Sequence, residues 1–147
     1  MKRLVLAIFI LSTQLFALTP FSLENLKALN VSVLHKGTLV NETKQATIKH
    51  DIEQRLHTLG IQTQTQTFAN LLIKIQTVSV GKETVAHISF LIAEEAILSR
   101  SIPTEGMAIG FQIDDLVHIQ DPLIDLEDTI NYLFDEFLEQ YKLENPR

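Results

Sequence analysis

Apolar and polar positions along the chain alternate in some stretches and recur every three or four residues in others. Alternation is expected of strands, because successive side chains point to opposite faces of a sheet. It occurs in residues 29–34, 69–80, 83–99 and 107–113. Helical spacing occurs in residues 43–59 and 126–141. The order predicts an α+β two-layer sandwich of β-α-β-β-β-α order. We expect about four strands, mostly antiparallel, with both helices packed on one face.

Turn and capping residues support these boundaries. Asn41 or Thr43 can cap the first helix, and Gly60 stands where a left-handed residue ends many helices. Ile61 can then fold back onto Leu56, as in a Schellman ending. The pair at 81–82, Gly-Lys, suits a two-residue hairpin turn between the second and third strands.

Two segments leave alternatives open. The pair Glu94-Glu95 interrupts the third strand, and "FLIAEEAIL" around it also fits a helix. The segment "QTQTQT" at residues 62–67 has no apolar face. It is expected to form an exposed loop, and the alternative is a free strand edge that pairs with a partner by β-augmentation.

Residues 111–141 hold nine carboxylates, one histidine and no Lys or Arg. Most of these acids fall within the second helix. At 100° per residue, its apolar side chains occupy one side, and the acids Asp128, Asp135, Glu136 and Glu139 lie on or near the opposite side. Asp125 is expected to cap this helix. The acids are therefore interpreted as a solvated helix face rather than a catalytic cluster.

The chain begins with Lys2 and Arg3, followed by the apolar run Leu4–Leu11 and a small residue, Ala17. This layout is typical of a secretory signal, and we predict a signal peptide at 1–17 and a single α+β domain at 18–147. The alternative is an uncleaved membrane anchor at 4–23, which would be the only membrane contact. Both alternatives predict a periplasmic location for the domain, tethered to the inner membrane if the signal is retained.

Composition excludes several classes of protein. The 147 residues include no cysteine, so disulfides, thiolate catalysis and the lipid-anchored cysteine of bacterial lipoproteins are excluded. Residues 101–147 hold eleven acidic and two basic residues, a net charge of −9. Such a charge repels nucleic acid and favours a partner with a basic surface. No phosphate-binding, dinucleotide-binding or nucleophile motif occurs, and no cofactor is expected.

Two groups of residues have the composition of a metal site. Asp114, Asp115, His118 and Asp121 could hold a divalent cation, although their spacing does not match a calcium loop. The alternative is a polar connection that ends at Asp121-Pro122. His50, Glu53 and His57 share one side of the first helix, as chelating residues can, but the favoured interpretation is an exposed helix face opposite the apolar stripe.

The helix ending "RLHTLGI", a polar stretch and the strand "ANLLIKIQ" resemble small envelope-assembly domains of Gram-negative bacteria. Examples are the N-terminal domain of TolB and accessory lipoproteins of outer-membrane assembly. The resemblance spans residues 41–76 and is one of pattern, and no functional residue is carried over from it. It implies a non-catalytic periplasmic module that binds another envelope protein. The alternatives are a protein that binds a small ligand or divalent cation, and an enzyme without a recognisable motif.

Overall fold

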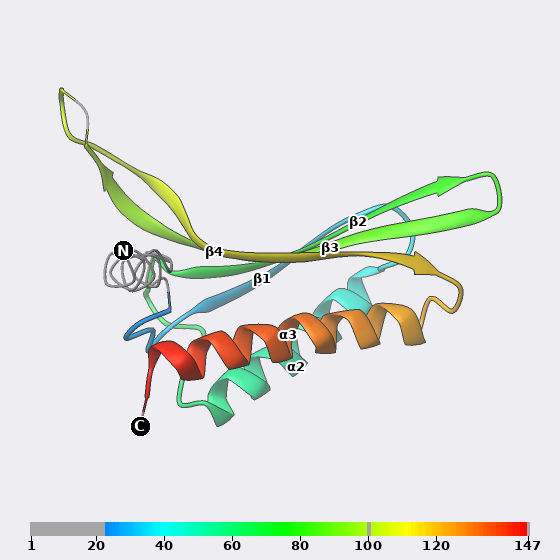
Figure 1. The fold of residues 1–147 in the computed structure, drawn as a ribbon, viewed down its shortest axis with the longest axis horizontal. Helices are drawn as coiled ribbons and strands as arrows, with labels where there is room; N and C mark the ends of the chain where they lie inside the picture. The colour runs from blue at the N-terminus through cyan, green and yellow to red at the C-terminus, as the bar shows by residue number, and fades with distance from the viewer. Residues whose placement is uncertain (1–22, 100, 147) are drawn as a thin grey trace, which may run out of the picture.

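The computed structural model describes residues 23–99 and 101–146. Its elements are β1 (Asn30–Lys36), α2 (Glu42–Thr58), β2 (Asn70–Val80), β3 (Glu83–Leu98), β4 (Thr104–Ile119) and α3 (Ile124–Glu144). The strands form one sheet in the order β1-β2-β3-β4. β1 runs parallel to β2, and the other two pairs are antiparallel. Both helices lie on the same face of the sheet (Figure 1), so the predicted α+β fold is confirmed.

The core lies between the helices and the face of the sheet that they cover. Alternate strand residues point into it, and all are almost fully buried: Val31, Val33, Leu71, Ile73, Ile75, Ala86, Ile88, Phe90 and Ile92. The helices contribute buried residues at the predicted spacing, among them Ile52, Leu56, Leu133, Phe134 and Phe137. Burial of apolar surface on this one face is therefore the main stabilising contribution to the fold.

The start of the described chain is tied to the end of α3. The Leu23 amide donates to a Glu144 carboxylate oxygen (2.7 Å), and the Asn145 side-chain amide donates to the Leu23 carbonyl (2.8 Å). The predicted signal peptide lies outside the described residues. So does the alternative anchor, except for Leu23. That residue is fully buried in the core. Neither described helix is long and apolar enough to cross a membrane.

The predicted ends of α2 and of the β2–β3 hairpin are confirmed. Asn41 caps α2, because its side chain accepts a bond from the Lys44 amide (2.8 Å). At the other end, Gly60 has φ +81°, and the Ile61 amide donates to the Leu56 carbonyl (3.1 Å), as a Schellman ending requires. Gly81 has φ +64° in the turn between β2 and β3.

The third strand has the predicted extent, and the fourth strand is longer than the sequence predicts. β3 continues through Glu94-Glu95, so the helical alternative is wrong; the register shifts between Ile92 and Ala93 instead, opposite Gly110. β4 continues to Ile119, so Asp114, Asp115 and His118 lie in a strand and the predicted polar connection is wrong there. Antiparallel pairing with β3 extends the strand beyond the run whose alternation is evident in the sequence.

Residues 62–67 form a loop, as expected, and not a free strand edge. The Gln62 amide and carbonyl bond to the lead-in segment, donating to Lys27 O and accepting from Leu29 N (2.9 Å each). The Gln64 side chain reaches back to Glu53 on α2 (3.0 Å). The backbone groups of Gln62 therefore have partners within the chain, and the rest of the segment forms the loop.

The beginning of α3 differs from the prediction, although its exposed face does not. The cap position is Leu123, which makes no side-chain capping bond, so the expected cap at Asp125 is wrong. Asp125 instead accepts bonds from the amides of Gln120 (2.6 Å) and Asp121 (2.7 Å), in the turn before the helix. Side chains of short acidic residues often bond to such turn amides in preference to helix amides. The four predicted face acids are exposed, which confirms their assignment to solvent.

Candidate protein-binding surface

The three predicted metal-binding candidates on α2 each bond to a different neighbour. His50 bonds to Gln54 (3.0 Å), and His57 bonds to Thr63 (2.8 Å). Glu53 is only 7% exposed, which corrects its assignment to an exposed helix face. Its carboxylate accepts from Gln64 and lies 3.8 Å from the Lys49 ammonium. The loop at 62–67 covers Glu53, which sequence spacing alone could not indicate.

The acidic candidates of β4 are spread along the strand on alternating faces. Asp114 accepts a bond from His87 on β3 (3.1 Å), which lowers the pKa of this carboxyl. His118 bonds to Glu83, and Asp115 bonds to the backbone of Leu116. Asp121 lies beyond the strand, in the turn that leads to α3. Within residues 23–99 and 101–146, no three His, Asp or Glu side chains gather closely enough to hold a metal ion.

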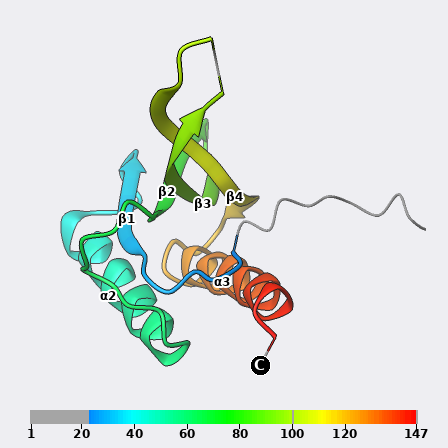
Figure 2. The same ribbon diagram turned by 90° about the vertical axis from the view of Figure 1, so that its left-hand side faces the viewer.

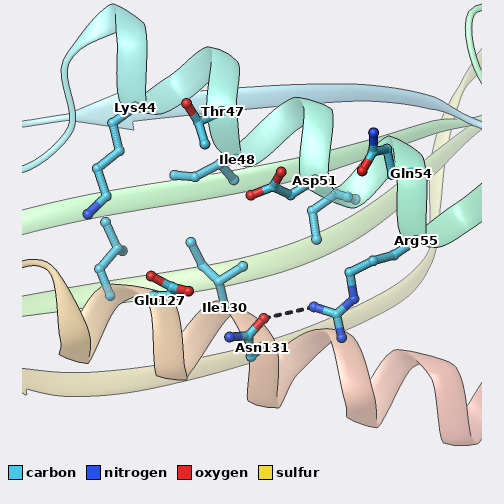
Figure 3. Close-up of a pocket in the computed structure, with 11 residues that line it drawn as sticks. Lys44, Thr47, Ile48, Asp51, Gln54, Arg55, Glu127, Ile130 and Asn131 are labelled. Atoms are coloured by element: carbon cyan, nitrogen blue, oxygen red, sulfur yellow. Dashed lines mark hydrogen bonds between the residues drawn. The ribbon is translucent and has the colours of Figure 1, made fainter.

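A groove of about 500 Å³ runs between the two helices (Figure 3). Buried apolar side chains from α2 and α3 form its floor, including Ile52 and Leu126. Charged side chains line the rim, and Lys44 extends from α2 toward α3.

Arg55 closes one end of this groove and links the two helices. Its guanidinium donates to Asn131 (2.8 Å) and to Asp135 (2.9 Å) on α3. The same group lies 3.9 Å from the centre of the Phe134 ring, a cation–π arrangement. The sequence indicates Asp135 only as a solvated acid, because nothing in it places α2 beside α3.

The face of the sheet opposite the helices carries exposed apolar side chains. Alternation along the strands places the residues between the core positions on this face. Four of the large ones are more than half exposed: Leu34 (51%), Val78 (63%), Val80 (73%) and Leu116 (68%). Polar side chains of the same face, including His87 and Asp114, lie between them. Exposed apolar surface on a sheet face that no helix covers is a candidate protein contact site.

The distal half of the β3–β4 hairpin rises above the rest of the sheet (Figure 2). It begins at the register shift opposite Gly110, because a bulge bends the strand and increases its twist. Its exposed apolar residues include Ile97, Met107 and Ile109, and the acids Glu95 and Glu105 lie among them. This arm extends the exposed apolar surface beyond the part of the sheet that the helices support.

No family model matches the chain, and no curated protein matches it. Large apolar side chains that are more than half exposed lie on the uncovered sheet face and its arm, and also at Phe68, Leu123 and Leu143 elsewhere in the described chain. Sequence alternation could have suggested Leu34 and Val78 as exposed. Leu116 could not be assigned, because its segment does not read as a strand until it is paired with β3.

Proposed function

We propose that the protein is a non-catalytic accessory module that is exported to the periplasm and binds another envelope protein. The observation that carries this proposal is the uncovered sheet face, with four large apolar side chains that are each more than half exposed. Exposing them to water costs free energy, and contact with a partner removes them from water.

Three further features support the proposal. The leader residues have the composition of an export signal. The charge of −9 in residues 101–147 favours a basic partner and disfavours nucleic acid or an anionic lipid surface. Finally, the histidine and acid candidates of the described chain are engaged in separate pairs, whereas catalysis requires groups that converge on one reacting position.

Site-specific cross-linking in the producing cells tests the proposal. A photo-reactive residue replaces Leu116 or Val78 on the uncovered face, and Asp128 on the exposed side of α3 serves as the control. We expect one defined adduct from the first two positions and none from Asp128. Equal labelling from all three positions, or none from any, would contradict the proposal.

Fractionation and affinity capture complete this test. The tagged protein should occur in the periplasmic fraction or, with its leader retained, in the inner membrane. Capture at low and at moderate salt should recover the same cross-linked protein in stoichiometric amount. A product found in the cytoplasm would count against export. Failure to recover the partner at both salt concentrations would count against binding.

A further inference from the structure

β4 is an edge strand that hydrogen-bonds to a neighbour on one side only. β3 occupies that side from Thr104 to Ile119. Beyond the bulge at Gly110, the segment Phe111–Ile119 pairs regularly and spans about 30 Å at roughly 3.4 Å per residue. No hydrogen bond from another described segment reaches the backbone of β4 on its outer side. Its length is ample for the pairing of a further strand.

The outward direction of alternate amides is visible at Leu116. Its amide donates to its neighbour, the Asp115 carboxylate (2.7 Å), and not to β3. In an antiparallel ladder, alternate residues direct their N–H and C=O groups toward the same neighbour. The amides of Gln112, Asp114 and His118 therefore share the outward direction of the Leu116 amide. An added strand would meet these amides, and at Leu116 it would replace the Asp115 carboxylate as acceptor.

The composition of β4 is unusual for a long edge. Edge strands of natural sheets commonly contain lysine or proline or are short, and these features prevent unwanted pairing with another strand. β4 has 16 residues, three acids, and no Lys, Arg or Pro. Its covered face presents Phe111, Ile113 and Val117, which are only partly buried against the core. Its uncovered face presents Asp114, whose side chain is about half exposed (45%).

We propose that the segment Phe111–Ile119 of β4 binds an extended, basic segment of a partner protein as a fifth strand of the sheet. This inference rests on the proposed function and specifies its surface and the chemistry of its partner. The bound segment alternates apolar residues, which contact Phe111, Ile113 and Val117, with Lys or Arg residues, which face Asp114. Backbone pairing supplies affinity, and the alternating side chains supply specificity.

A second copy of this chain is the less favourable occupant of the edge. Pairing β4 with β4 of another copy would bring together two regions that each carry a net charge of −9. Like charges across an interface oppose association, whereas a basic strand is attracted to the same surface. Sedimentation of the purified exported protein at low and moderate salt tests this point, and we expect a monomer at both.

Peptide binding to the purified exported protein tests strand addition directly. The probe is a fluorescent nine-residue peptide that alternates Lys and Val, and its anisotropy is followed as protein is added. Two control peptides replace Lys by Glu or methylate alternate backbone nitrogens. We expect saturable binding of the first peptide, and binding at least about tenfold weaker for both controls, since one loses charge attraction and the other loses backbone donors.

A matched pair of variants locates the site. L116P removes an outward amide, which an edge strand tolerates, whereas L116A shortens the same side chain and keeps the amide. We expect L116P to weaken peptide binding about tenfold and L116A less than about threefold. Circular dichroism checks that both variants remain folded. Equal affinity of folded L116P and the unchanged protein would overturn strand addition.

Hydrogen exchange keeps the inference testable if L116P fails to fold. In the unchanged protein, the peptide should protect the amides of Gln112, Asp114, Leu116 and His118 from exchange. Exchange rates unaltered by saturating peptide would overturn the inference. A dimer of the purified protein that the peptide dissociates would show that a second copy occupies the edge, which would overturn the choice of a basic partner. If strand addition fails while cross-linking from Leu116 and Val78 persists, the proposed function stands and its partner binds the sheet face.

Discussion

The two faces of the sheet differ although the same strands form both. On β3, Ile88 and Phe90 are fully buried beneath the helices, whereas their neighbour His87 bonds to Asp114 on the open side. A substitution on the covered face removes packing that the fold requires. A substitution on the open face leaves this packing in place and changes the exposed surface. Under the proposed function, alternate residues of the same strands would therefore serve stability and partner binding separately.

The largest expected effect comes from a charge placed in the layer that the helices share with the sheet. Phe137 is fully buried, and its ring lies 5.7 Å from the rings of both Phe111 and Phe134. Phe137→Asp should unfold the domain, since it forfeits about 3–5 kcal/mol of packing and buries an unpaired carboxylate. Tyr132→Asp, at an exposed position of the same helix, should remain folded by circular dichroism. A folded Phe137→Asp protein would contradict this account of the core.

A matched pair on the sheet itself sharpens the comparison between its faces. Phe90→Ala should lower the free energy of unfolding by about 3–5 kcal/mol, because the side chain is fully buried. Leu116→Ala should change it by less than about 0.5 kcal/mol, because Leu116 is mostly exposed. Urea unfolding followed by circular dichroism measures both. Similar losses for the two variants would mean that the open face also supports the fold.

Arg55→Ala tests whether the contacts of Arg55 with α3 stabilise the helix layer on the covered face of the sheet. The expected loss is about 1–2 kcal/mol, because the variant removes a ring contact with Phe134, a hydrogen bond to Asn131 and a partly exposed ion pair. Arg55→Lys keeps the charge but not the planar two-donor geometry, so it should recover only part of the loss. An unchanged urea midpoint in Arg55→Ala would show that the helices need no such link.

The smallest effect concerns the His87–Asp114 pair of the open face. The hydrogen bond from His87 lowers the pKa of Asp114 below its ordinary value of 3.8. The stabilisation from this carboxylate is therefore complete above pH 3.8 and is lost as the pH falls through the lower pKa of the folded state. NMR titration of Asp114 in the unchanged protein and in His87→Ala measures the shift. An identical titration in both would exclude His87 as its cause.

Local signals in the sequence predicted most of the fold. Asn41, Gly60 and Gly81 mark their boundaries correctly, because capping and left-handed conformations depend on a few neighbouring residues. Prediction was wrong where a neighbouring strand determined the outcome. Residues 114–119 do not alternate clearly by themselves, yet they extend β4 because β3 provides a complementary ladder of backbone partners.

The sequence by itself determined the strand and helix order, the apolar side of each helix and the exposure of the acids on α3. These properties follow from periodicity, which is local. Only the tertiary structure decided that Arg55 links the helices, that the loop at 62–67 covers Glu53, and that β4 forms a long edge free of Lys, Arg and Pro. Each depends on which segments lie side by side, because a contact or an edge is a relation between distant parts of the chain.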